Sequence, residues 1–315
     1  MWLITSSVVL GWGLGANDAA NVFGAAVSSQ VLRWGTAAVL TAAFVTIGAV
    51  AQGAGGVHTV GSVVEQTSVQ AVISMFAAGL SVLVLTTLKL PVSTSQAVIG
   101  GLVSVGLITG ADVNGQVLVK VVTCWVGTPI GAAVFAVIFY YLLAMVFARF
   151  EMTLFTYDTL VRRGLVVLGI YAAYSLGANN VGNVSGVLYQ AESFDLSVTL
   201  ACLIGGAFIA FGVLTYSKNV MRTVGRGLVP LDGFCALVVM LSSAATIHVY
   251  AMVGVPVSSS QAVVGAVIGI AFVKGLALLN RGMVVRVLFG WIATPLVAGA
   301  IAAAIYGLRA ISPML

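Results

Sequence analysis

Long apolar segments separated by short polar connections make up most of this chain of 315 residues. Most of them are close to, or longer than, the roughly 20 residues that a membrane-spanning helix needs. Only helices and closed barrels satisfy the backbone in lipid, and these segments do not alternate polar with apolar residues, so they predict helices. The apolar segments are Trp2–Val27, Ala37–Ala51, Val69–Leu88, Val117–Val146, Leu165–Leu188, Leu196–Leu214, Phe234–Met252 and Val284–Leu308.

The charged residues indicate the same class of protein. They make up 7% of the chain, against about 25% in a soluble domain, so a soluble protein is excluded. The 13 Lys and Arg residues form no basic tract, which argues against nucleic acid as a partner and favours orientation in a lipid bilayer. Cys124, Cys202 and Cys235 stand alone in apolar stretches, without metal-ligand spacing, and are interpreted as packing residues. We expect a multi-pass protein of the plasma or inner membrane.

Four motifs occur twice, in the same order. GANDAANV at residues 15–22 matches GANNVGNV at 177–184, and LPVSTSQAV at 90–98 matches VPVSSSQAV at 255–263. TVG at 59–61 recurs at 223–225, and W-x-x-T-P at 125–129 recurs at 291–295. Because order and spacing are kept, the chain is predicted to consist of two homologous transmembrane repeats. We place them at residues 1–150 and 164–315, with a cytoplasmic linker at 151–163.

The charges of equivalent loops predict that the second repeat is inverted. The loop after the first apolar segment carries Arg33, whereas its counterpart in the second half carries Glu192 and Asp195. Since basic loops stay on the cytoplasmic side, equivalent loops should lie on opposite sides of the membrane. The next loop shows the reverse bias, with His58 and Glu65 in the first half but Lys218, Arg222 and Arg226 in the second. The fold class predicted is therefore all-α and polytopic, with two inverted-topology repeats and both termini outside.

The polar motif at 90–98 predicts a helix that begins inside the membrane. The helix after it, Gln96–Gly110, would span roughly 22 Å, short of the roughly 30 Å hydrocarbon core. Pro91 disfavours helix before it, and the hydroxyls that follow are natural N-caps. A broken or re-entrant helix of this kind turns free N–H groups and a positive dipole end toward the midplane, which suits an anion. Inversion brings the second copy, Ser258 to Gln261, to the same place, although such hydroxyls can also simply bond carbonyls within or between helices.

The first repeated motif predicts a cation site. An ionised Asp18 in the middle of an apolar segment costs about 2.5–3.5 kcal/mol, so it needs a partner. The glycines at 13, 15 and 24 suit a locally unwound helix whose carbonyls, together with the Asn17 and Asn21 side chains, could coordinate a monovalent cation. Equivalent oxygens in the second half come from Asn179, Asn180 and Asn183. The simpler alternative, that these residues only pack helices, leaves Asp18 unexplained.

Cation sites beside two anion-binding caps describe a cation-coupled anion symporter rather than an enzyme, because bound cations would neutralise an anion that is costly to desolvate. Two alternatives stay open. Ser185 and His248 could suggest an intramembrane serine hydrolase, although such an enzyme needs no duplicated caps. A passive anion channel would usually line its pore with rings of charge, which these segments lack.

The paired motifs GANDAANVFG with GANNVGNVSG, and PVSTSQ with PVSSSQ, resemble the signatures of the inorganic phosphate transporter (PiT) family. The resemblance implies symport of inorganic phosphate coupled to sodium, or else to protons, with external termini, a cytoplasmic linker, a homodimer and no cofactor besides the coupling ion. It places phosphate binding on Ser93, Thr94, Ser95, Ser258, Ser259 and Ser260, with Gln96 and Gln261 adjoining, and sodium binding on Asn17, Asp18, Asn21, Asn179, Asn180 and Asn183.

Three residues depart from the family pattern, at two kinds of position. The second signature usually carries an acid where this chain has Asn180, which affects the number of coupling cations. Gln96 and Gln261 stand where many members have histidine, so no proton relay is expected at these positions. Some relatives carry sulfate, so a sulfate permease stays an alternative. Phosphate can donate an O–H and sulfate cannot, so Asp18 would favour phosphate if it faces the anion as an acceptor.

Overall fold

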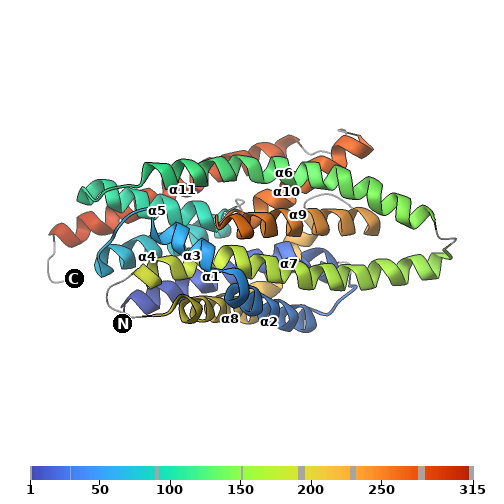
Figure 1. Cartoon of the computed structure of the whole chain (residues 1–315), viewed down its shortest axis with the longest axis horizontal. Coiled ribbons are helices and arrows are strands. Elements are labelled where there is room, and N and C mark those ends of the chain that lie inside the picture. Colours follow the sequence, from blue (N-terminus) through green and yellow to red (C-terminus); the bar gives the residue numbers. More distant parts are fainter. Residues whose placement is uncertain are drawn as a thin grey trace.

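The computed structural model describes residues 2–28, 30–88, 92–149, 152–190, 196–227, 232–275 and 281–311. Within these ranges the chain forms eleven helices, most of which run along one long direction (Figure 1). Seven helices are long and apolar enough to cross a membrane, so the prediction of an all-helical polytopic protein is confirmed. The helices are α1 (Trp2–Ser28), α2 (Trp34–Gln52), α3 (Ala54–Gly61), α4 (Ser68–Thr87), α5 (Thr94–Thr109), α6 (Gly115–Ala148), α7 (Leu154–Gln190), α8 (Val198–Gly227), α9 (Gly233–Val253), α10 (Ser259–Lys274) and α11 (Arg281–Ile311).

The two halves of the chain start and finish at opposite ends of the bundle. The start of α1 and the end of α11 lie at one end, and the connection between α6 and α7 lies at the other (Figure 1). Each half therefore makes a net crossing of the bundle. Residues 154–163, which the sequence predicts to belong to the linker, form the first turns of α7.

Helices α4 and α5 form a hairpin with its tip inside the bundle. Val64, before α4, pairs with Val113, after α5, and the N–H of Asn114 donates to the Val63 carbonyl at 2.9 Å. The start of α4 and the end of α5 are thus fixed at the same place, the base of the hairpin. Helix α5 has 16 residues, which corresponds to about 24 Å. The expected half-helix, with its N-terminus buried, is present.

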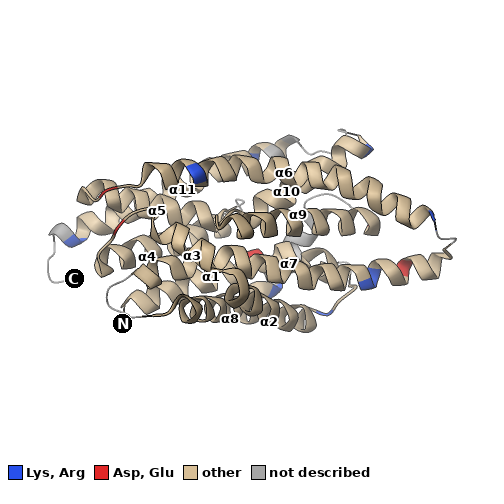
Figure 2. Ribbon diagram, in the orientation of Figure 1, with Lys and Arg blue, Asp and Glu red and all other residues tan. Residues whose placement is uncertain are grey.

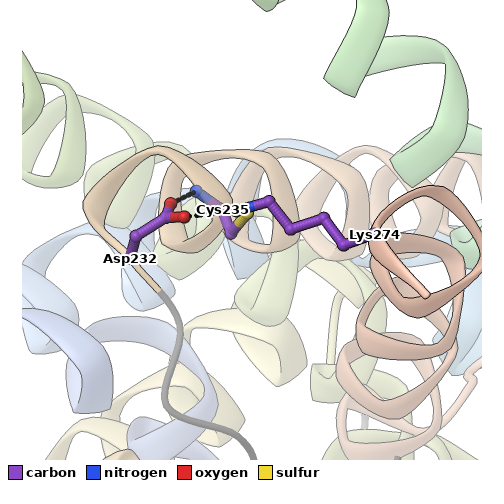
Figure 3. A network of polar contacts seen from close by, with 3 residues as sticks. All are labelled: Asp232, Cys235 and Lys274. Atoms are coloured by element: carbon purple, nitrogen blue, oxygen red, sulfur yellow. Dashed lines mark hydrogen bonds and ion pairs between the residues drawn. The ribbon is translucent and has the colours of Figure 1, made fainter. Parts of the chain in front are cut away.

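An ion pair closes the base of the equivalent hairpin, α9–α10. Asp232 caps α9 by accepting from the backbone N–H of Cys235 at 2.8 Å, and it also accepts from Lys274 in the last turn of α10 (Figure 3). Partial burial acts to raise the pKa of Asp232, but the hydrogen bonds from Lys274 and Cys235 lower it below its ordinary value. Gly233 packs against Val161 near the start of α7, so this base lies at the linker end of the bundle. The two hairpins therefore enter from opposite ends.

Helices of one half pack on helices of the other at very short range. Helix α1 packs along α8, and α2 packs along α7. A Cβ on Gly15 would overlap the carbonyl of Ile209, and a Cβ on Gly177 would overlap the carbonyl of Val45. Gly15 and Gly177 occupy equivalent positions of the two repeats, and so do Val45 and Ile209. The two crossings are therefore related by an approximate two-fold symmetry.

The half-helices rest on the two proline-containing helices. Helix α5 packs on α11 at Pro295, and α10 packs on α6 at Pro129. A proline inside a helix removes one backbone hydrogen bond. The preceding threonines, Thr128 and Thr294, bond back to carbonyls of the previous turn, each at 2.6 Å. The repeated W-x-x-T-P motif thus marks equivalent docking points for α5 and α10.

The outer surface of the bundle suits lipid. Charged residues are few and stand singly on the ribbon, with long uncharged stretches of helix between them (Figure 2). Helix α6 exposes a row of apolar side chains along its length, which includes Val119, Val126, Ile130, Val134 and Ile138. Apolar side chains exposed over a full helix length fit a hydrocarbon environment or a second protein surface, and not water.

Replacing Gly15 by alanine is expected to destabilise the protein by about 1–3 kcal/mol, because the added methyl group meets the backbone of α8, which cannot move aside cheaply. Thermal unfolding in detergent measures the effect. Gly13→Ala is the matched control on the same helix, since the nearest atom to its added Cβ is Val82 Cγ1 at 3.9 Å. Equal stability of the two variants would contradict the close crossing of α1 and α8.

Candidate functional site

Both half-helices begin with a capping serine inside the bundle. Ser93 Oγ accepts from the backbone N–H of Gln96 at 3.4 Å, and Ser258 Oγ accepts from that of Gln261 at 3.3 Å. The predicted N-caps are therefore present. We call residues 92–96 the first tip and residues 257–261 the second tip. Every side chain of the two tips is buried except that of Ser260, which is partly buried.

The two tips lie side by side and bond each other reciprocally. Ser95 Oγ donates to the carbonyl of Val257 at 3.2 Å, and Ser260 Oγ donates to the carbonyl of Val92 at 3.1 Å. These donors and acceptors occupy equivalent positions of the two repeats. The hydroxyl-rich ends of α5 and α10, far apart in sequence, therefore form one polar centre between the hairpins.

Helix α1 brings an acid to the second tip. Asn21 Nδ2 donates to Ser259 Oγ at 2.9 Å, and Asn17 Nδ2 donates to the Asp18 carboxylate at 2.9 Å. The Ser259 side chain also hydrogen-bonds Asp18. Asp18 is 3% exposed and is the only charged side chain buried in the described part of the chain. We call Asn17, Asp18, Asn21 and Ser259 the Asp18 half-site.

Helix α7 brings only amides to the first tip. Asn183 Nδ2 donates to Ser95 Oγ at 2.9 Å and to Asn180 Oδ1 at 3.1 Å. Ser95 Oγ also lies 3.3 Å from Asn180 Oδ1, which shares the single proton of this hydroxyl with the Val257 carbonyl. We call Ser95, Asn180 and Asn183 the Asn180 half-site. It is the counterpart of the Asp18 half-site, but it contains no charged group.

Asn179 holds the extended segment that leads into the second tip. Its Oδ1 accepts from the backbone N–H of Val257 at 2.8 Å, and its Nδ2 donates to the carbonyl of Val255 at 2.9 Å. The side-chain amide thus pairs with both backbone groups, as a neighbouring strand would. Sequence reasoning grouped Asn179 with the cation ligands and missed this contact, because nothing local indicates which backbone an asparagine will meet.

Several buried polar atoms at the tips have no protein partner. Buried polar groups are nearly always hydrogen-bonded, so a cluster of unpartnered ones indicates a ligand site. Of eight such atoms in the described residues, five lie in the two tips and on α7. They are Thr94 Oγ1, Gln96 Oε1, Asn180 Nδ2, Asn183 Oδ1 and Gln261 Oε1.

This arrangement can hold an anion and a cation together. Two helix N-termini present free N–H groups and positive dipole ends, which suit a tetrahedral oxyanion. Asp18 lies at the second tip, where its charge would oppose an anion. The Asp18 carboxylate is a hard oxygen ligand of the kind that a small cation prefers. The cluster joins residues predicted for both ligands into one site.

The expectation that α1 is locally unwound is wrong. The helix runs without interruption from Trp2 to Ser28, as does α7 through the equivalent motif. Gly15 serves the close crossing with α8 instead. Because the carbonyls of a continuous helix are used within it, α1 can offer a cation its side-chain oxygens only.

The residues considered for a serine hydrolase do not meet. Ser185 Oγ donates to the Ala201 carbonyl at 2.7 Å. The His248 ring lies between Tyr171 Oη at 2.9 Å and Gln52 Oε1 at 2.7 Å, so both of its nitrogens are hydrogen-bonded away from Ser185. Among the described residues no group of three His, Cys, Asp or Glu side chains could hold a metal ion.

Comparison with known proteins identifies the family. The family model described as "Phosphate transporter family" matches residues 14–157 and again residues 155–302, which confirms the two repeats. A solved structure titled "The sodium-dependent phosphate transporter" has the same fold, with a TM-score of 0.90 and 21% sequence identity over 99% of this chain and 98% of that one.

Two relatives differ in the substrate that they are named for. "Sulfate permease CysP" of Bacillus subtilis is 30% identical over 93% of this chain and 83% of its own length. A protein of Methanocaldococcus jannaschii named "Putative phosphate permease" is 25% identical over 90% of this chain and 89% of its own.

Replacing Asn179 by alanine is expected to destabilise the protein, because it leaves the buried N–H of Val257 without its partner, at about 1–3 kcal/mol for each unpaired group. Thermal unfolding in detergent tests this effect. The control is Asn17→Ala, at the equivalent position of the first repeat, where the side chain is partly buried and bonds only the neighbouring Asp18. If both variants lose the same stability, Asn179 does not brace the second tip.

Proposed function

Because the chain belongs to the phosphate transporter family, we propose that it is a secondary active symporter that couples uptake of inorganic phosphate to a monovalent cation, with sodium preferred over the proton. The observation that supports this function best is the meeting of two buried, hydroxyl-capped helix N-termini next to Asp18. A passive channel needs no such closed polar centre.

Charge explains the coupling. An oxyanion at the tips would lie beside the ionised Asp18 in surroundings from which water is largely excluded, where like charges repel strongly. A cation bound at the Asp18 half-site removes this repulsion. The cation and the anion therefore bind better together than either binds alone, which is the thermodynamic basis of symport.

The arrangement of the hairpins suits alternating access. The tips meet in the interior, while the bases of α4–α5 and α9–α10 lie at opposite ends of the bundle. Movement of one hairpin relative to the other helices would open the site to one side, and movement of its counterpart would open it to the other side. We propose that the repeats are inverted across the membrane, with both termini outside and the α6–α7 connection in the cytoplasm. The exposed apolar side of α6 is available for lipid or for the homodimer that the family resemblance implies.

Sulfate is the second candidate substrate, since the sulfate permease named above is 30% identical to this chain over the aligned residues. The two anions have the same shape, but at neutral pH only phosphate can donate a hydrogen bond. The free side-chain carbonyl oxygens of Gln96 and Gln261 are acceptors. We favour phosphate, because a buried acceptor that faces sulfate would stay unpaired.

Uptake of labelled phosphate into vesicles that contain the purified protein tests the function. An inward sodium gradient should drive phosphate above equilibrium, and uptake should stop when the gradient is dissipated. A proton gradient is applied separately, and excess sulfate is added as competitor. Purely downhill flux would show a channel instead, and complete inhibition by sulfate with weak self-competition by phosphate would identify a sulfate permease.

Asp18→Ala is expected to reduce gradient-driven uptake to background, because the cation loses the only charged side chain that is buried among the described residues. The variant should remain folded, which size-exclusion chromatography and thermal unfolding will show. Asp112→Ala removes an exposed acid between α5 and α6 and serves as the control that keeps uptake. Full transport by the Asp18 variant would refute the assignment of the cation to this residue.

A further inference from the structure

The two half-sites differ by one charge at equivalent positions. Asp18 and Asn180 occupy the same place in the repeated motif, and both side chains are buried, at 3% and 1% exposed. Asp18 lies at the tip of α10, and Asn180 lies at the tip of α5. The approximate symmetry of the bundle therefore places a carboxylate on one side of the site and a neutral amide on the other.

The oxygens of the neutral side are largely occupied. Asn180 Oδ1 accepts a hydrogen bond from Asn183 Nδ2 at 3.1 Å, and it lies 3.3 Å from Ser95 Oγ, whose single proton it shares with the Val257 carbonyl. Asn179 Oδ1 accepts from the backbone N–H of Val257. A neutral amide oxygen that already receives such donors offers a cation little attraction. Only Asn183 Oδ1 remains without a partner among the amide oxygens of this group. The Asp18 carboxylate also accepts hydrogen bonds, from Asn17 and Ser259, but it attracts a cation through its negative charge.

From this asymmetry we infer that the transporter carries one coupling cation for each anion, bound at the Asp18 half-site, and that the Asn180 half-site binds none. The inference rests on the proposed symport. Asn180 then acts through its amide: Oδ1 holds Ser95 and Asn183 in place, and the unpartnered Nδ2 is a donor in the buried site. A donor attracts an anion and repels a cation.

The charge of the loaded site agrees with a single cation. A carboxylate at position 180 would bring one negative charge, and a second cation would bring one positive charge. The amide brings neither charge. A site with an amide and one cation therefore has the same net charge as a site with a second carboxylate and a second cation. The neutral residue thus lowers the number of cations without a further penalty for burying charge.

The consequence is electrical. One monovalent cation carried with a divalent anion moves one net negative charge inward, whereas two cations would make transport electroneutral. An inside-negative membrane potential should therefore oppose uptake by this protein. An electroneutral carrier would not respond to the potential.

Vesicles that contain the full chain test the stoichiometry. Uptake of ²²Na and of ³²P-phosphate is measured in parallel at alkaline pH, where phosphate is divalent, and the membrane potential is clamped with valinomycin and potassium. The native protein should take up one sodium ion per phosphate, and an inside-negative potential should slow it. Asn180→Asp should double the ratio of sodium to phosphate and abolish the effect of the potential.

The double variant Asp18→Asn with Asn180→Asp moves the carboxylate to the Asn180 half-site, so that the site still contains one carboxylate. It should retain one sodium ion per phosphate. This result would show that the number of buried carboxylates, and not the position of the carboxylate, sets the number of sodium ions. Two sodium ions per phosphate in the native protein, or potential-independent uptake by it, would overturn the inference even if Asn180→Asp fails to fold. The proposed function, coupled uptake of phosphate, would still hold after either of these results. The absence of any gradient-driven uptake would refute the proposed function itself.

Discussion

The structure depends on one constraint: two helix N-termini end inside an apolar bundle, where unpaired N–H groups are costly. Each terminus meets part of this cost locally through its capping serine, Ser93 or Ser258. The hydroxyls of Ser95 and Ser260 then bond the opposite tip, which fixes the two hairpins together. Among the described residues, five of the eight buried polar atoms without a partner belong to the two tips and to α7. The proposed ligand site is therefore where buried polar groups have no hydrogen-bond partner within the protein.

The site also depends on how the repeats exchange helices. Helix α1 packs along α8 and α7 along α2, while the half-helices rest on α11 and α6 of the opposite repeat. Neither half buries its own motif helix by itself. Residues from both repeats consequently surround the same centre. A substitution on the motif helix of one repeat therefore removes contacts to the tip of the other repeat. Asn21 with Ser259, and Asn183 with Ser95, are the direct contacts.

The sequence predicted the features that have local causes. Helix length and capping residues predicted two buried half-helices, and the repeated order predicted that they meet. The prediction of an unwound α1 failed, because glycine serves equally for unwinding or for close packing, and only the position of α8 shows that Gly15 packs. The role of Asn179 was missed for the same reason, since its partners, Val255 and Val257, lie more than seventy residues away. Which oxygens are already occupied is a property of the tertiary structure.

The bases of the two hairpins are fastened by different kinds of bond. The α4–α5 base is joined through main-chain groups near Val64 and Val113, whereas the α9–α10 base is joined by the partly exposed pair of Asp232 and Lys274. Dissolved ions weaken an exposed ion pair and leave a backbone hydrogen bond nearly unchanged. The two ends of the molecule therefore differ in their response to ionic strength: added salt loosens the fastening nearest the α6–α7 connection first, and the opposite fastening stays as it was.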